Sequence, residues 1–327
     1  MPERWLVTGA LGCIGAWTIK TLLDDGEEVI GYDLGDDPRR LALVMPPEDL
    51  ARVKLEQGDI TDFSALERVL DGNEIRRVVH LAAMQVPFCR ADPVLGARVN
   101  VVGTVNVFEA VKRRRERIPG VAWASSAAVY SADDPTPAPE AGGYRPATHY
   151  GVYKLANEGT ARIYWADDGV PSIGLRFYVV YGAGRDQGMT SAPTQAIAAA
   201  ARGEAFEISY GVVAQYDYAP DVARAFVLAG RAVRSGAGVY NFPGVVAPMA
   251  DVVAAIEAAA PDVAGRITWV EQPLAFPEGL ETGRLEQAVG PVPRTPLADG
   301  VRATVDLLRE ARGALTRGPM RTSQPHD

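Results

Sequence analysis

The chain has 327 residues with 33 Lys or Arg and 41 Asp or Glu side chains, giving a formal net charge of -8 at pH 7. This acidic balance excludes nucleic acid as the main partner, because phosphate contacts require a basic surface, and no uninterrupted apolar run approaches the ~20 residues that span a membrane. Two cysteines, Cys13 and Cys89, and three histidines support neither a disulfide framework nor a metal site, so we expect a cytoplasmic protein without a metal.

Short β-rich runs alternate with helical patterns over the first half of the chain. The expected strands are residues 4–8, 28–33, 53–56, 77–81 and 121–125. The expected helices are residues 13–25, 63–70, 92–117 and 150–168, the last ended by Gly169. This alternation predicts an α/β fold, in which helices cover both faces of a doubly wound parallel Rossmann sheet.

The second half is richer in proline and in irregular segments. Its expected strands are residues 172–177, 205–209, 239–242 and 266–271, and its expected helices are 192–201, 221–233, 249–259 and 297–314. These predict a Rossmann domain over 1–178, rejoined by about 204–235, and a smaller C-terminal α/β substrate-binding domain from 179–203 and 236–312. The polar residues 313–327 predict a disordered tail.

Three glycines follow the first expected strand and open the first expected helix. Gly9, Gly12 and Gly15 permit a tight turn, a close approach of backbone to a pyrophosphate and close packing of helix on strand. Glycines also mark ordinary turns, but Asp33 ends the second strand 18 residues later, where a carboxylate accepts hydrogen bonds from a ribose diol. We therefore expect a dinucleotide at this helix N-terminus. Asp33 repels a 2′-phosphate, which favours NAD over NADP.

A tyrosine and a lysine one helical turn apart are candidates for acid–base chemistry. Tyr150 and Lys154 share one face of the expected helix. A free tyrosine has a pKa near 10, and we expect the Lys154 ammonium and a nicotinamide ring to lower the pKa of Tyr150. Tyr150 then removes a proton from an alcohol. Without other evidence, a tyrosine and a lysine at this spacing are usually ordinary residues on the surface of a helix.

A serine directly after the fifth expected strand completes the set. Doubly wound sheets place ligands at the carboxyl ends of their strands, which is where Ser126 lies. Its hydroxyl can hydrogen-bond the reacting oxygen. Taken by itself, this motif also fits a serine-rich turn.

In order and spacing, the chain closely resembles the extended short-chain dehydrogenase/reductase family, which contains sugar-nucleotide epimerases and dehydratases. The resemblance is continuous over about the first 180 residues and rests on residues 8–15, Asp33, 58–60, 80–83, 100–106, 125–130, 150–154 with Glu158, and 175–182. It implies that Ser126, Tyr150 and Lys154 are catalytic and that the protein is a homodimer. It implies cofactor contacts from Gly9, Leu11, Gly12, Cys13, Ile14, Gly15, Asp33, Asp59, Ile60, Leu81, Ala82, Ala83, Asn100, Tyr150, Lys154 and Tyr178.

Departures from the family pattern bear on the substrate. Family dehydratases carry Asp-Glu after the catalytic hydroxyl residue, where this chain has Ala127 and Ala128. Sugar-nucleotide enzymes commonly place an asparagine at the position of Val179 and an arginine near residues 214–223, which hold no basic side chain. These changes weaken the case for a nucleotide diphosphate substrate. The candidate substrate contacts are Gln85, Ser126, Tyr150, Tyr178 and Arg185.

Three functions follow. We prefer an NAD-dependent oxidoreductase that oxidises a secondary alcohol on a sugar, sugar acid or similar polyol-like substrate by hydride transfer to NAD. Arg185 is then the best candidate to hold a carboxylate or phosphate, although a solvated loop arginine is an equal alternative. A UDP-sugar 4-epimerase with tightly bound NAD and a 4-keto intermediate is the second hypothesis. A non-catalytic NAD-binding sensor is the third.

Overall fold

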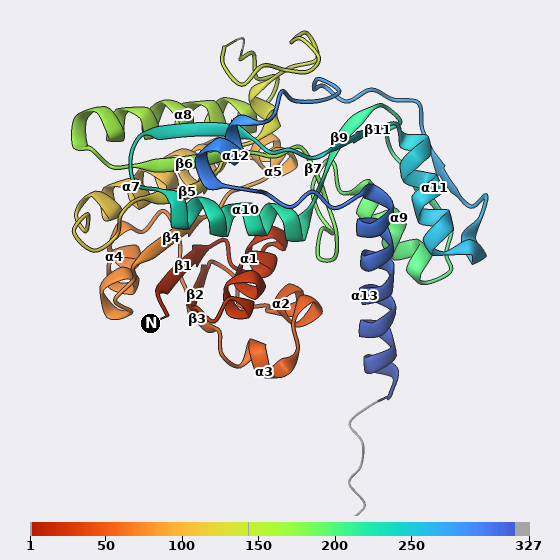
Figure 1. Ribbon diagram of the computed structural model, residues 1–327, viewed down its shortest axis with the longest axis horizontal. Helices are drawn as coiled ribbons and strands as arrows, with labels where there is room; N and C mark the ends of the chain where they lie inside the picture. The colour runs from red at the N-terminus through yellow and green to blue at the C-terminus, as the bar shows by residue number, and fades with distance from the viewer. Residues whose placement is uncertain (1, 143, 318–327) are drawn as a thin grey trace, which may run out of the picture.

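The computed structural model describes residues 2–142 and 144–317, with side chains as far as residue 313. Its centre is a parallel seven-stranded sheet in the order β10-β6-β5-β4-β1-β2-β3 (Figure 1). The strands are β1 (Arg4–Thr8), β2 (Glu28–Asp33), β3 (Lys54–Gln57), β4 (Arg77–His80), β5 (Val121–Ala124), β6 (Ser172–Arg176) and β10 (Ala237–Asn241). The predicted doubly wound Rossmann sheet is confirmed.

Helices cover both faces of this sheet, which is why β4, β5 and β6 are buried along their whole length. On one face α1 (Cys13–Asp24) packs against α10 (Ala219–Ala232). On the other face α7 (Gly103–Lys112) lies between α4 (Phe63–Gly72) and α8 (His149–Asp168). Each face holds its own apolar cluster, so the sheet is the middle layer of the core.

Local signals in the sequence set the ends of α8. Thr148 caps its N-terminus by accepting a hydrogen bond from the Gly151 N–H at 3.0 Å. Gly169 ends the helix in the left-handed conformation at φ 64°. This helix therefore begins and ends almost where the sequence predicts, and its start fixes the position of the residues that follow Thr148.

The predicted helix over 92–117 is interrupted. It consists of α6 (Pro93–Ala97), a π-helical turn (Arg98–Val102) and α7. By length and mean hydropathy (1.3), the stretch Pro93–Lys112 could cross a membrane, although Arg98, Glu109 and Lys112 interrupt its apolar residues. In the fold 44% of its most apolar window is buried. Val107, Phe108 and Val111 pack in the core beneath the sheet, whereas Val94, Leu95 and Val102 are exposed.

A smaller region adjoins the carboxyl ends of the strands, at the right of Figure 1. It holds a sheet of β7 (Val179–Tyr181), β9 (Ala214–Tyr218) and β11 (Val245–Ala247), and a pair formed by β8 (Phe206–Ile208) and β12 (Ile267–Trp269). The helices α9 (Ala192–Ala201), α11 (Met249–Ala259) and α13 (Leu297–Arg317) pack around them. These elements enclose the third apolar cluster.

The chain passes between the two regions at other points than predicted. Residues 206–218 form β8 and β9 of the smaller region, although we expected the Rossmann domain to resume near 204. Residues 237–241 form β10, which pairs with β6 in the large sheet rather than joining the smaller domain. The helix α12 (Arg284–Val289) also packs on the large-sheet side, against α10 and β10. The sheet to which a short strand belongs is determined by pairing with strands distant in the sequence, so local composition does not predict its domain.

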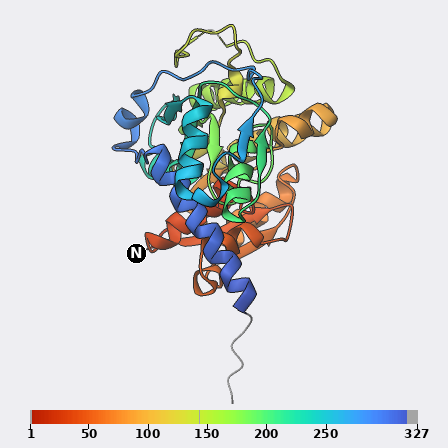
Figure 2. The same cartoon turned by 90° about the vertical axis from the view of Figure 1, so that its right-hand side faces the viewer.

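The C-terminal helix is longer than expected. α13 runs to Arg317 and projects from the smaller region (Figures 1 and 2). Residues 313–317 are therefore helical, where we expected the tail to begin; the rest of the predicted tail lies outside the described residues. Further elements had no clear signal in the sequence, namely α2 (Arg39–Val44), α3 (Pro47–Leu50), α5 (Val86–Ala91), β7, β9, β11 and α12.

Candidate active site

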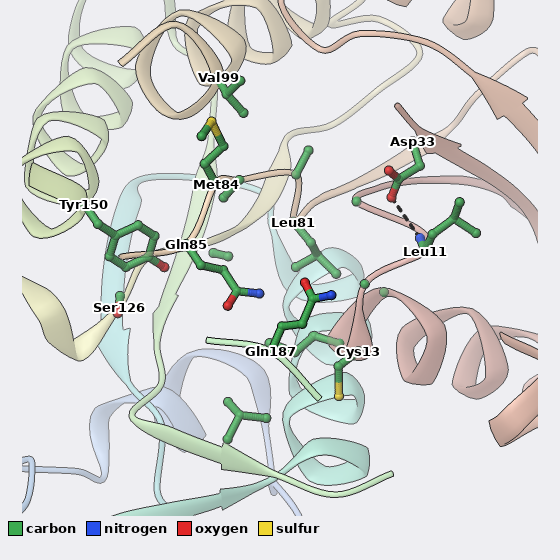
Figure 3. Close-up of a pocket in the computed structure, with 18 of the residues that line it drawn as sticks. Leu11, Cys13, Asp33, Leu81, Met84, Gln85, Val99, Ser126, Tyr150 and Gln187 are labelled. Carbon is green, nitrogen blue, oxygen red and sulfur yellow. Dashed lines mark hydrogen bonds between the residues drawn. The ribbon is translucent and has the colours of Figure 1, made fainter. Parts of the chain in front are cut away.

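A cavity of about 650 Å³ opens at the carboxyl ends of the parallel strands and is closed on its far side by the smaller region. It is lined by every predicted site residue except Asn100. Figure 3 shows Tyr150 and Ser126 at one end of the cavity and Leu11 with Asp33 at the other. The structure thus brings the glycine loop and the Tyr–Lys pair, which are about 140 residues apart in the chain, into one site.

The glycine loop has the shape of a dinucleotide cradle. Gly9 has a φ of 70°, and a Cβ there would lie 2.7 Å from the Ala82 nitrogen. A Cβ at Gly15 would overlap the Gly9 carbonyl oxygen. Only glycine fits at these two positions, because other backbone segments approach them closely. Without side chains there, the N-terminus of α1 remains accessible to a phosphate.

Asp33 completes the cradle at the end of β2. Its carboxylate accepts hydrogen bonds from the N–H of Leu11 at 2.9 Å and from that of Gly35 at 3.3 Å. Each carboxylate oxygen keeps a further lone pair, which leaves Asp33 able to accept ribose hydroxyls. The residues present therefore fit a dinucleotide with a free 2′-hydroxyl.

Ser126, Tyr150 and Lys154 meet at the other end of the cavity. Ser126 begins a turn (the Ser126 turn, residues 126–129) after β5, and its Oγ accepts from the Ala128 N–H at 3.1 Å. Tyr150 lies in the first turn of α8. One turn later, Lys154 Nζ donates to the Ala124 carbonyl at 2.7 Å and lies 5.5 Å from the Tyr150 ring centroid.

Burial opposes ionisation of the Tyr150 phenol. It raises the pKa of Tyr150 to about 12, against the opposing effects of a hydrogen bond with Ser126 and the charge of Arg185. The Lys154 ammonium lies 5.5 Å from the centre of the Tyr150 ring while it donates to the Ala124 carbonyl. Burial also lowers the pKa of Lys154 to about 8. In the protein itself burial thus keeps the Tyr150 phenol protonated at neutral pH. The expected lowering by Lys154 together with a nicotinamide ring stays a prediction.

A buried ion pair supports the Ser126 turn from below. Arg176 on β6 makes two bonds of 2.7 Å to the Glu158 carboxylate on α8. Ser125 Oγ donates to the same carboxylate at 2.6 Å, and Arg176 also donates to the Tyr130 hydroxyl at 2.8 Å. Glu158 and Arg176 appeared in the sequence only as parts of the family pattern. Here they tie β5, α8 and β6 together beneath the site.

Asn100 does not line the cavity, contrary to the predicted cofactor contact. It is 1% exposed in the π-helical turn, where its Oδ1 accepts from the Met84 N–H at 2.7 Å. Its Nδ2 donates to the Met84 carbonyl at 3.0 Å. With both amide atoms used by one backbone residue, Asn100 shapes the turn that follows β4. Residues 82–85 of that turn do line the cavity.

Three polar atoms near the reacting end have no hydrogen-bond partner among the described residues. They are Gln85 Oε1, Arg185 Nε and the Tyr178 hydroxyl, all of which are buried. Buried polar groups are nearly always satisfied in folded proteins. Since all three residues line the cavity, these atoms are suited to hold polar groups of a ligand. The ring of Tyr178 is fixed by an edge contact with Phe276, at 5.8 Å between centroids.

Several lining residues were missed from the sequence. Phe276 comes from an irregular segment of the smaller region, and no motif surrounds it. Others include Met84, Val86, Phe177, Val180, Gln187, Met189 and Thr190. Most of these lie within a few residues of a predicted site residue, so proximity in the chain was the only available signal. Cys13 also lines the cavity, and burial raises its pKa to about 12, which excludes a reactive thiolate.

Comparison with known proteins finds one matching family model. The model of the NAD dependent epimerase/dehydratase family matches residues 5–242. Among curated proteins, UDP-glucuronate 4-epimerase 2 of Arabidopsis thaliana is 33% identical over 182 residues, which cover 54% of this chain and 42% of that protein. The chain thus spans less than half the length of that relative.

Solved structures match nearly the whole chain. UDP-glucose 4-epimerase of Thermus thermophilus, in complex with NAD, has a TM-score of 0.78 at 27% identity, and the match covers 94% of this chain and 100% of that chain. A monomeric L-threonine 3-dehydrogenase from a metagenome has a TM-score of 0.80 at 21% identity, with coverage of 94% and 99%. At 21% identity, the similarity to the L-threonine 3-dehydrogenase shows a shared fold and nothing more.

Proposed function

Because the chain belongs to the NAD-dependent epimerase/dehydratase family, we propose that it is an NAD-dependent oxidoreductase that oxidises a secondary alcohol on a sugar, sugar acid or similar polyol-like substrate. The cofactor is NAD, which fits the glycine loop and Asp33. The observation that carries the proposal is the single cavity in which that loop faces Ser126, Tyr150 and Lys154.

In this proposal the Tyr150 oxygen, in its phenolate form, accepts the proton of the reacting hydroxyl group. When bound, NAD would accept the hydride from the carbon that carries this hydroxyl group. Ser126 Oγ donates to the substrate oxygen and holds it beside Tyr150. The pKa of about 12 means that Tyr150 needs positive charge nearby to act as a base. Lys154 provides it from the same helix face, and its Ala124 hydrogen bond keeps the ammonium in place.

One basic side chain, that of Arg185, is available to bind an anionic group at the substrate end of the cavity. Four basic side chains line the cavity in the described part of the chain, namely Arg39, Arg40, Lys154 and Arg185. Arg40 pairs with Asp186, Arg39 also lies near Asp186, and Lys154 is committed to Ala124. Arg185 remains to attract a single anionic group, with Gln85 and Tyr178 beside it. This charge count favours a carboxylate or one phosphate over a diphosphate, and so a sugar acid over a nucleotide sugar.

A 4-epimerase is the second candidate. It is favoured by the curated relatives, whose printed names are those of UDP-sugar 4-epimerases. Against it stand Val179, which offers no hydrogen bond where family enzymes commonly place an asparagine, and residues 214–223, which lack the basic side chain that those enzymes commonly carry there. The two functions share the chemistry of Tyr150 and differ in whether NADH leaves the site.

A panel of sugars, sugar acids and UDP-sugars, incubated with the protein and NAD, separates the candidates. A dehydrogenase accumulates NADH in stoichiometric excess over protein. An epimerase converts a UDP-sugar to its epimer without net NADH. NAD binding with neither activity would indicate a sensor. For a confirmed substrate, Tyr150→Phe is expected to lower kcat by at least ~100-fold, and unchanged turnover in this variant would refute the role of Tyr150.

Oligomeric state and compartment stay predictions. The family resemblance implies a homodimer packed through α7 and α8, and Val102 and Ile163 are 46% and 45% exposed on these segments. Val107 on α7 is buried in the core beneath the sheet, and Val99 lines the cavity. Light scattering of the purified protein measures the mass directly, and a monomer would refute the dimer.

A further inference from the structure

A single irregular segment forms the outer wall of the cavity. This roof segment (residues 182–191) connects β7 to α9 and contributes Arg185, Gln187, Met189 and Thr190 to the lining. The glycine loop lines the same cavity. Figure 3 shows the Gln187 side chain from the roof segment directed toward that of Gln85. A dinucleotide on the glycine loop therefore lies beside the roof segment.

The roof segment is attached to the dinucleotide end of the site by an ion pair. Asp186 Oδ1 accepts from Arg40 Nη2 at 2.6 Å and from Arg40 Nε at 3.2 Å. The remaining nitrogen of the same guanidinium, Nη1, donates to the Leu11 carbonyl in the glycine loop at 2.9 Å. Arg40 thus bridges the roof segment and the glycine loop. It is only 18% exposed, so its position is well defined.

Further contacts fix the two ends of the roof segment rather than its middle. At the start, the Ala183 carbonyl accepts from Trp17 Nε1 on α1 at 2.9 Å. Toward the end, Gly188 lies so close to Gln85 that a Cβ there would overlap the Gln85 Oε1. Between these points the Asp186 carboxylate is held by Arg40 and, at 3.7 Å, by Arg39 Nη2. A weaker bond of 3.2 Å runs from Gln195 Nε2 to the Asp186 carbonyl.

Glycines lie on both sides of Asp186. Gly184 has a φ of 89° and Gly188 a φ of 105°. Glycine can leave either conformation easily, because without a Cβ it adopts both positive and negative φ angles at little energetic cost. The segment that carries Asp186 can therefore swing on these residues once its attachment to Arg40 is broken. Hinges of active-site loops are commonly of this kind.

We propose that Arg40 and Asp186 form a latch that retains the dinucleotide, so that breaking this ion pair limits cofactor exchange. The proposal rests on the cavity holding NAD, as argued above. Arg40 and Asp186 are 146 residues apart in the chain, and they must separate before the roof segment can move away from the glycine loop. Retention of this kind bears on function, because a dehydrogenase exchanges its cofactor in every turnover and an epimerase does not.

The test measures the rate at which NADH leaves the full-length protein. Protein loaded with NADH is mixed with excess NAD in a stopped-flow instrument, and the loss of NADH fluorescence is followed. Asp186→Asn keeps the shape of the side chain and the Arg40–Leu11 bond but removes the charge. We expect release to be about three- to tenfold faster, as for loss of one partly exposed ion pair. The difference should shrink at high salt, where charges are screened within about 3 Å.

Two further variants make the result specific. Arg40→Gln should also speed release, and the double variant should release NADH no faster than Arg40→Gln alone if both residues act through one contact. Asp25→Asn breaks the Arg224–Asp25 pair on the far side of α1 and should leave the rate unchanged. Normal release from Asp186→Asn would overturn the latch but not the proposed function. If the wild-type protein binds no NADH, both proposals fail.

Discussion

Replacing Gly151 with alanine tests whether the approach of α8 to the Ser126 turn fixes the position of Tyr150. A methyl group at Gly151 would overlap the Ala128 carbonyl oxygen and lie 2.9 Å from Pro146 Cβ and 3.0 Å from the Ala128 carbonyl carbon. Unstrained carbon contacts begin near ~3.5 Å. The helix and the turn must therefore separate by roughly half an ångström or more, and Tyr150 moves with the helix.

Such a displacement acts directly on the reacting pair. A shift of ~1 Å costs on the order of 100-fold in rate, so we expect Gly151→Ala to lower kcat about 10- to 100-fold. The overlap should also lower the free energy of unfolding by about 1–3 kcal/mol. The rate is measured from NADH formation with the alcohol identified in the substrate panel, and stability from urea unfolding.

Gly159, on the same helix, provides the matched control. A Cβ there would meet nothing within 4 Å. Gly159→Ala should therefore keep kcat and raise the free energy of unfolding by about 0.5–1 kcal/mol, because alanine is the better helix former. A folded Gly151→Ala protein with the kcat of the wild type would refute the reasoning, since it would show that this contact does not position Tyr150.

Three other predictions concern stability and cofactor choice. Arg176→Met leaves the Glu158 carboxylate buried without its partner and should lower the free energy of unfolding in urea by about 3–5 kcal/mol. Arg231→Ala removes a pair whose arginine side chain is 37% exposed and should lower it by less than ~1 kcal/mol. Equal losses in the two variants would contradict this account. Burial raises the pKa of Asp217 to about 7, so the folded state keeps a proton that the unfolded chain releases above about pH 4. Stability should then fall by up to ~4 kcal/mol between about pH 4 and pH 7, and Asp217→Asn should remove this fall; a variant that keeps the wild-type pH profile would refute the assignment. Asp33→Asn should reduce the preference for NADH over NADPH at least about tenfold in fluorescence titrations, and an unchanged ratio would show that Asp33 does not select the cofactor.

Local signals predicted the parts of the molecule that depend on neighbours in the chain. The glycine loop was predictable because Gly9 and Gly15 are required by close backbone approach. The helix α8 was predictable from Thr148 and Gly169, which end it at both sides. Since parallel strands place their carboxyl ends at one edge, the meeting of the glycine loop with Ser126 followed from the order of the strands.

The parts that could not be predicted depend on pairing between distant segments. β9 has only five residues and is positioned by β7 and β11. Asn100 left the site because a π-helical turn interrupts the long helix, and periodicity does not reveal such a turn. The upward effect of burial on the pKa of Tyr150 could not be predicted, because the depth of burial is a property of the folded packing. Arg40 and Asp186 carry no motif that joins them.

The repeated passage of the chain between the large sheet and the smaller region has a consequence for how substrate range can change. After β6 the backbone enters the smaller region, returns for α10 and β10, leaves again for β11 and α11, and returns once more for α12 before α13. The smaller region is therefore not a continuous stretch that could be cut out and exchanged for that of a relative. New specificity in this scaffold must arise by substitution at single positions that line the cavity, such as Gln85, Tyr178 and Arg185, with the rest of the interleaved chain kept in place.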